Sequence, residues 1–199
     1  MKKPTEDRRV RKTKKALRQG FAKLLNQKPA KDITVRELSD LVDLHRGTFY
    51  LHYKDIFDLQ AQIEDELIQE FHDALDHSCD IGIGNDITKH FLAVLEYIKE
   101  NADMAKALLN NNGDLSFFQR ICDLAREHCL NDFEELYPNS TSELYEYCGH
   151  YAVNGSIGVV RHWLNTGMEL SCEQVAQMIG RMVLDGVGVL KSDMQQREK

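Results

Sequence analysis

Apolar residues recur at three- and four-residue intervals along nearly the whole chain, which is typical of amphipathic helices. One uninterrupted stripe predicts a long helix that begins near Lys54; its apolar members are Ile56, Leu59, Ile63, Leu67, Phe71 and Leu75. No segment alternates with a period of two, and the three prolines lie where helices are expected to begin or end. The pattern therefore predicts an all-α protein.

The same periodicity sets approximate limits for the other helices. They are expected over 8–26, 34–42, 46–52, 87–99, 102–109, 115–136 and 142–165, with a last helix capped by Ser171. This order predicts a three-helix head, a linking helix and a five-helix body. We place the domain boundary so that 1–55 forms the head and 56–199 the body.

The two short helices at 34–42 and 46–52 are joined by three residues, which is helix-turn-helix anatomy. Thr34 and Glu37 have the spacing of a capping box, in which Glu37 reaches back to the start of the helix. Asp43 stands in the turn, where a residue that tolerates the left-handed conformation is needed.

The first of these helices has Leu38, Leu41 and Val42 as its predicted buried face. The second helix of such a motif enters the major groove of DNA.

The second short helix has suitable chemistry for that role. Arg46 begins it, and Gly47 has no side chain to hold the backbone away from DNA. Thr48 and Tyr50 provide hydroxyl groups, and His52 and Lys54 follow at the far end. An exposed aromatic residue between basic groups is suited to sugar and phosphate contacts.

The net charge of −7 conceals an asymmetry. Residues 1–60 carry 15 Lys+Arg against 8 Asp+Glu, or +7, so the remainder carries −14. A basic head on an acidic body predicts that only the head meets a polyanion.

Two runs carry a resemblance to a known family. ITVREL at 33–38 and LHRGTFYLHYKD at 44–55 look like the DNA-binding signature of the tetracycline-repressor (TetR/AcrR) family. The match covers about residues 8–60, and the acidic helical body resembles the family only loosely. Three positions depart from the usual pattern: Asp43 stands where Gly is usual, His45 where Ser is common, and Ile56 where Lys is frequent.

The resemblance assigns roles to individual residues. It implies that Thr34 and Arg36 touch phosphates and that Arg46, Thr48 and His45 face base edges. It implies that Tyr50, His52 and Lys54 contact the DNA backbone. A further implication is that Gly47 lies where the protein backbone comes closest to the DNA. It also implies that Phe49 and Tyr53 belong to the core.

The body is expected to bind an effector and to form the dimer. Its aromatic residues are in the first place core residues, and the resemblance implies a pocket between the middle helices. Our guess for its lining is Phe91, Leu95, Phe118, Cys122, Tyr147 and Tyr151. Glycines in the last two helices, at 149, 155, 158, 180, 186 and 188, predict close helix approach, with a four-helix dimer interface as the candidate.

Five cysteines without C-x-x-C spacing predict free, mostly buried thiols in a reducing compartment. His128-Cys129 with Cys122, and Cys148 with His150, were weighed as metal or thiol sensors. Neither set has a spacing that closes a tetrahedral site by itself. We therefore predict no metal and no cofactor.

The predicted function is that of a sequence-specific DNA-binding regulator, a homodimer on a palindromic operator, acting as a repressor released by a small-molecule effector. The alternative is a protein-interaction adaptor or co-regulator of the same fold with no such ligand. An enzyme is not expected, because G-x-S-x-G, H-E-x-x-H and a Gly-rich phosphate loop are missing. The charged start and short apolar runs predict a cytoplasmic location and no membrane partner. The sequence does not specify the operator, the regulated genes, the effector or whether one exists, or whether the regulator represses or activates.

Overall fold

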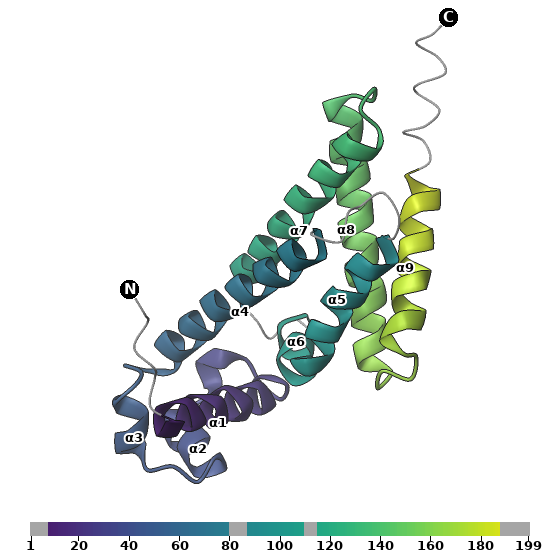
Figure 1. Cartoon of the computed structure of the whole chain (residues 1–199). Coiled ribbons are helices and arrows are strands. Elements are labelled where there is room, and N and C mark those ends of the chain that lie inside the picture. Colours follow the sequence, from purple (N-terminus) through teal and green to yellow (C-terminus); the bar gives the residue numbers. More distant parts are fainter. Residues whose placement is uncertain (1–7, 80–86, 110–114, 188–199) are drawn as a thin grey trace, which may run out of the picture. The chain divides into compact units, whose positions relative to one another are not determined.

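The computed structural model describes residues 8–79, 87–109 and 115–187, and every regular element within these ranges is helical (Figure 1). The helices are α1 (Arg8–Leu25), α2 (Val35–Leu41), α3 (Arg46–Tyr50), α4 (Ile56–Cys79), α5 (Ile87–Glu100), α6 (Ala102–Leu109), α7 (Leu115–Leu136), α8 (Ser142–Asn165) and α9 (Cys172–Gly186). A short 3-10 turn, Ala30–Asp32, precedes α2. The predicted all-α class is confirmed.

The chain divides into two compact units. The first is Met1–Leu67 with Asp103–Leu115, and the second is Ile68–Ala102 with Ser116–Lys199. Helix α4 therefore contributes residues to both units. Helix α6 groups almost entirely with the first unit, although its place in the sequence led us to expect it in the body. The division into functional domains at residue 55 remains a prediction.

The core of the first unit is built by α1, α2, α3 and the first part of α4. Its fully shielded side chains include Leu17, Phe21, Leu25, Leu38, Phe49 and Leu59. The amide of Asn26, just after α1, donates a hydrogen bond of 2.7 Å to the carbonyl of Asp103 in α6. This bond ties the end of α1 to the helix that joins the first unit from later in the sequence.

The long apolar stripe predicted from the sequence is confirmed in α4. All six of its members are buried, from Ile56 to Leu75. None of the described helices combines the length and the apolar character that crossing a bilayer requires.

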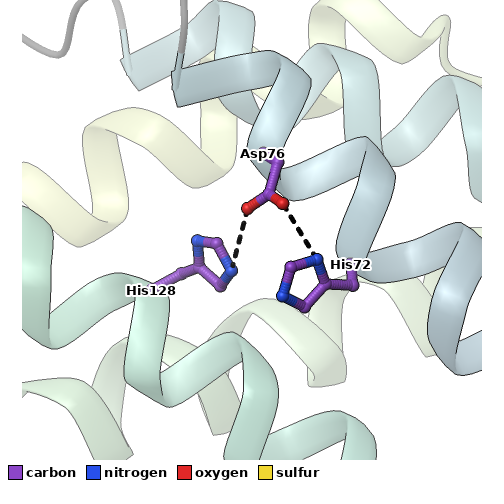
Figure 2. Close-up of side chains that lie close together, drawn as sticks. All are labelled: His72, Asp76 and His128. Atoms are coloured by element: carbon purple, nitrogen blue, oxygen red, sulfur yellow. Dashed lines mark ion pairs between the residues drawn. The ribbon is translucent and has the colours of Figure 1, made fainter.

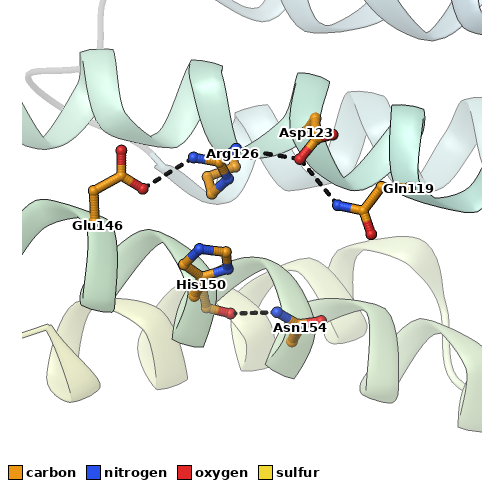
Figure 3. Close-up of polar contacts among 6 residues, drawn as sticks. All are labelled: Gln119, Asp123, Arg126, Glu146, His150 and Asn154. Atoms are coloured by element: carbon orange, nitrogen blue, oxygen red, sulfur yellow. Dashed lines mark hydrogen bonds and ion pairs between the residues drawn. The ribbon is translucent and has the colours of Figure 1, made fainter.

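In the second unit, α9 packs against α5 and α8. Arg126 on α7 donates to Glu146 on α8 at 2.9 Å and to Asp123 on its own helix at 3.2 Å (Figure 3). Arg126 thus links α7 to α8 at an exposed position.

The ends of α8 and α9 follow the sequence prediction. Gly167 has φ +80°, and the amide of Met168 donates to the carbonyl of Trp163 at 2.9 Å, which is the Schellman ending of α8. Ser171 caps α9, and Gln174 completes a capping box with it.

Two aromatic residues of α8 correct the expectation that the body's aromatics are core. Tyr147 is 70% exposed and Tyr151 is 55% exposed, whereas Trp163 and Phe117 are buried as expected. Burial would remove the hydroxyl of each tyrosine from water, so exposure avoids that desolvation cost. The two residues lie one helical turn apart on one face of α8, which we call its outer face.

Candidate nucleic-acid interface

The turn between α2 and α3 is closed by a left-handed residue. Asp43 has φ 53°. The amide of Leu44 donates to the carbonyl of Ser39 at 2.9 Å, and that of Asp43 to Asp40 at 3.4 Å. These two bonds form a Schellman motif, which requires the left-handed region at Asp43. The predicted turn is confirmed, and the structure shows why the family favours Gly at this position.

The start of α2 is capped by one side chain only. The amide of Glu37 donates to the hydroxyl of Thr34 at 3.2 Å. The carboxylate of Glu37 does not reach back as predicted: it accepts a hydrogen bond of 2.6 Å from Lys28. A full ammonium charge competes better for a carboxylate than a backbone amide does. The capping-box prediction is therefore wrong in its second half.

His45 takes over the capping role that Ser has in the family pattern. Its Nδ1 accepts a hydrogen bond of 3.1 Å from the amide of Gly47, at the N-cap of α3. When Nδ1 accepts, a neutral imidazole carries its proton on Nε2. The exposed ring therefore caps the helix with one nitrogen and leaves a donor on the other.

Gly47 leaves room for this capping ring. A Cβ atom at Gly47 would lie 3.1 Å from Nδ1 of His45 and 3.6 Å from its Cε1. The position therefore serves the cap as well as the close backbone approach to DNA expected from the sequence.

Helix α3 is turned so that one side is core and the other faces solvent. Phe49 is 0% exposed and its ring contacts those of Tyr50 and Tyr53, with centroids 5.5 and 5.6 Å apart. Tyr50 itself is 58% exposed, so it is not a packed core tyrosine. The core roles expected for Phe49 and Tyr53 are confirmed. Arg46 is exposed and Thr48 half-buried on the remaining surface.

Hydrogen bonds at the start of α4 fix the segment that follows α3. The amide of Lys54 donates to Asp58 at 2.8 Å, and the amide of Asp58 donates to Asp55 at 2.8 Å. The Lys54 amide, followed by the side chain of Gln62, lowers the pKa of the Asp58 carboxyl. These bonds fix the backbone that carries the exposed Lys54, while His52 beside it is half-buried.

Thr34 and Arg36 lie exposed at the start of α2. Arg36 is 3.7 Å from Asp40 one turn later, with both side chains more than two-thirds exposed. Such a loose pair contributes little to stability. Turning the Arg36 guanidinium from Asp40 to a phosphate would therefore cost little free energy.

Three apolar residues near α3 lie unexpectedly exposed. Leu41 was predicted to be buried but is 49% exposed; Leu51 is 80% and Phe57 60% exposed. Helix α2 is only two turns long, and its packed side is filled by Leu38 and Ser39. Leu51 follows Phe49 by two residues, which places it on the opposite face of a helix. That spacing was a signal for Leu51 that the sequence analysis missed.

Comparison with known proteins identifies the family of the chain. Residues 85–185 match the family model described as "Transcriptional regulator C-terminal region" (TetR_C_8). The chain belongs to the TetR family of transcriptional regulators.

A curated protein related to this TetR-family regulator is only distantly similar. The chain is 22% identical over 171 residues to the uncharacterized HTH-type transcriptional regulator YxbF of Bacillus subtilis (strain 168), covering 84% of this chain but 43% of YxbF. The chain thus spans less than half the length of that relative.

Among solved structures, it is similar to the fatty acid degradation regulator FadR from Bacillus halodurans, with TM-score 0.67, 12% identity and coverage of 93% and 98% of the two chains. It is also similar to the dihydroxyacetone kinase operon activator DhaS, with TM-score 0.59, 16% identity and coverage of 89% and 97%. At these identities the likeness shows the fold.

The six residues expected to line an effector pocket of this regulator differ in exposure, and the pocket itself stays a prediction. Leu95 is buried, and Phe91, Phe118 and Cys122 are half-buried, all on α5 and α7. On α8, Tyr147 is exposed, whereas Tyr151 is partly covered because its ring lies against Gly186 of α9.

The thiols of Cys122 and Cys129 on α7 are poorly suited to a metal or thiol sensor. Burial and the neighbouring Asp132 raise the pKa of Cys129 to about 12, and burial also raises the pKa of Cys122. A thiol that stays protonated is a weak nucleophile and a weak metal ligand.

Proposed function

We propose that this TetR-family regulator binds a palindromic operator as a homodimer, through α3 and the residues that flank it. Arg46, Thr48 and His45 would read base edges, and Tyr50, His52 and Lys54 would hold the backbone. Thr34 and Arg36 would hold phosphates beside α2, and Gly47 would permit the close approach. We further propose that it is a repressor, located in the cytoplasm and released by a small-molecule effector.

One observation carries the proposal: α3 buries Phe49 completely while its polar and basic side chains stay on the solvent side. A helix anchored on one face and polar on the other fits the major groove. The net charge of +7 over residues 1–60 favours the approach of this part of the chain to phosphate.

The test is selection of bound DNA from a random pool with the full chain, followed by binding measurements at two salt concentrations. A palindromic site should be enriched. Arg46→Ala should cost about 1–3 kcal/mol on that site and relax the preference at one base position. The matched control is Lys99→Ala, an exposed cation on α5. Binding without any enriched site would contradict the proposal and favour the adaptor alternative.

For the dimer we propose the outer face of α8 with α9. Tyr147 on α8 and Met182 on α9 are 70% and 51% exposed, large apolar surface for an isolated chain. Gly188 lies outside the described residues, and the described glycines of these helices fall into two groups. Gly149, Gly180 and Gly186 have neighbouring side chains within 3.3 Å of an added Cβ, so they serve packing inside the chain. At Gly155 and Gly158 no atom of the described residues comes within 4 Å of an added Cβ, which leaves them available for a second copy.

For the effector we propose a site bordered by α5, α7 and α8 within the second unit. Arg161 of α8 lies with its guanidinium carbon 6.0 Å from the ring centroid of Phe118. Its Nε is shielded from solvent and has no hydrogen-bond partner among the described residues. A buried donor of a cation without a partner favours a ligand with an acidic group.

This effector class can be tested by thermal shift with dodecanoate and with dodecanol as the neutral control. Dodecanoate should raise the melting temperature, dodecanol should not, and Arg161→Gln should remove the difference. Equal shifts from both compounds would contradict an acidic effector without touching the DNA proposal.

A further inference from the structure

Two histidines and an aspartate from two helices converge in the second unit (Figure 2). His72 and Asp76 lie one turn apart on α4, and His128 comes from α7. Nδ1 of His72 is 2.9 Å from Oδ2 of Asp76, and Nε2 of His128 is 3.8 Å from Oδ1. The three ligand atoms lie within 4.8 Å of one another.

The contact between His72 and Asp76 is close but is not a hydrogen bond. Nδ1 of His72 is shielded from solvent and has no hydrogen-bond partner in the described part of the chain, although a carboxylate oxygen lies 2.9 Å away. The distance would permit a bond, so the ring nitrogen is not aligned with that oxygen.

A shared metal ion accounts for this geometry. An ion bound in tetrahedral geometry to a nitrogen and an oxygen at about 2.0–2.2 Å each holds those two atoms about 3.3–3.6 Å apart. This separation lies between the 2.9 Å and 3.8 Å of the two His–Asp contacts here. The lone pairs then point at the ion and not at each other. Figure 2 shows Asp76 between the two imidazoles, where each of its oxygens faces one ring.

We propose that His72, Asp76 and His128 bind one divalent transition-metal ion of the zinc class. Two imidazoles and a carboxylate suit Zn²⁺, Co²⁺ or Ni²⁺, whereas Mg²⁺ and Ca²⁺ prefer oxygen ligands throughout. Three protein ligands leave at least one coordination position for water. The His72 and Asp76 side chains are 45% and 53% exposed, so an ion can enter from solvent, while His128, at 14%, forms the inner wall.

The bound ion would join α4 to α7 inside the second unit. This site was not predicted from the sequence, where His128 was weighed only with its neighbour Cys129 and with Cys122. The proposal concerns the metal alone and holds whether or not the chain binds DNA.

The test uses the full chain without an affinity tag, stripped with a chelator and desalted. Titration with Co²⁺, followed by its visible absorption, and with Zn²⁺, followed by calorimetry, should show one ion per chain. His72→Gln, His128→Gln and Asp76→Asn should each weaken binding at least tenfold, because a directly bound ligand matters at least as much as the groups that orient it. His150→Gln, an exposed histidine on α8, is the matched control and should bind as the parent does.

Circular dichroism of each metal-free variant shows whether it is folded, and Asp76→Asn, close to isosteric, keeps the test available if a histidine variant unfolds. The proposal is overturned if the parent binds no Co²⁺ or Zn²⁺. It is equally overturned if the three variants bind as tightly as the parent, if His150→Gln abolishes binding, or if Mg²⁺ competes at equal concentration.

Discussion

Asp43 shows how a single residue determines the helix-turn-helix. Its φ of 53° costs an ordinary residue about 1–2 kcal/mol of conformational strain, and this strain is largest for a β-branched residue. We expect Asp43→Val to lower the free energy of unfolding by about that amount. Asp43→Gly should stay within about 1 kcal/mol of the parent, because relief of strain is offset by a freer unfolded chain. Urea unfolding of the two variants checks this; equal losses would contradict it.

His45 provides a second prediction at the level of one residue. His45→Ala removes the acceptor for the Gly47 amide and should cost about 0.5–2 kcal/mol of stability. His45→Asn restores a cap and should recover most of that loss. If Asn restores the stability but not the DNA affinity, Nε2 of His45 contributes to binding as proposed. If both variants are as stable as the parent, the cap has no energetic role.

The separate residues of the candidate interface were predicted more successfully than their contacts. Thr34, Asp43 and Phe49 lie as expected, because turn chemistry and helical spacing are local properties. The capping by His45 and the diversion of Glu37 to Lys28 depend on which partners tertiary structure brings within reach. Local patterns do not contain that information.

At the level of helices, Gly20 decides how closely α1 and α2 pack. A Cβ at this position would overlap Cγ1 of Val42 and lie 3.0 Å from Cδ1 of Leu38. Ala gains about 1 kcal/mol in helix propensity over Gly, while overpacking typically costs about 1–3 kcal/mol. Gly20→Ala should therefore lower stability by about 1 kcal/mol. Equilibrium unfolding checks this prediction, with Gln19→Ala at the exposed neighbouring position as the control. A Gly20→Ala variant more stable than the parent would show that α2 can shift to accommodate the methyl group at little cost.

Asp132 on α7 makes the stability of the protein depend on pH. Burial, and then Glu135, raises the pKa of its carboxyl from 3.8 to about 6. The folded state thus holds the proton more tightly than the unfolded state, so stability falls as the pH rises from about 4 to 6, and the full cost remains above 6.

Asp132→Asn removes this cost. It should be more stable than the parent by about 1 kcal/mol at pH 7.5, a value reduced for partial solvent screening, and by less at pH 4.5. The measurement is urea unfolding at both values with a chelator present, and Glu134→Gln is the exposed control. A gain that does not depend on pH would exclude the carboxyl as its cause.

The helices themselves followed from the sequence because each buries one apolar stripe, and the stripe fixes both the type and the extent of the element. Two features of the fold were not predicted from the sequence. Leu41 has the spacing of a buried residue, but it lies at the edge of the contact with Gly20 of α1 and stays 49% exposed. Helix α6 groups with the first unit through Asn26 and Asp103, which are remote in sequence. Both depend on contacts between elements, which periodicity does not specify.

For the whole molecule, the central question is what covers the outer face of α8, and Gly155 can answer it. It lies exposed in the middle of a helix, and within the ranges that the structure describes no atom comes within 4 Å of an added Cβ. If this face meets only water, Gly155→Ala should stabilise the chain by about 1 kcal/mol through helix propensity alone. If a second copy packs there closely, the methyl group separates the two helices.

We expect the second result: Gly155→Ala should weaken the dimer about tenfold, equivalent to about 1.4 kcal/mol. The melting temperature should then fall most at low protein concentration, because dissociation is linked to unfolding. Sedimentation equilibrium measures the dimer directly, and Asn131→Ala on the exposed side of α7 is the control. A variant that is more stable than the parent at every concentration, with an unchanged dimer, would place the interface elsewhere and leave Tyr147 without the role proposed for it.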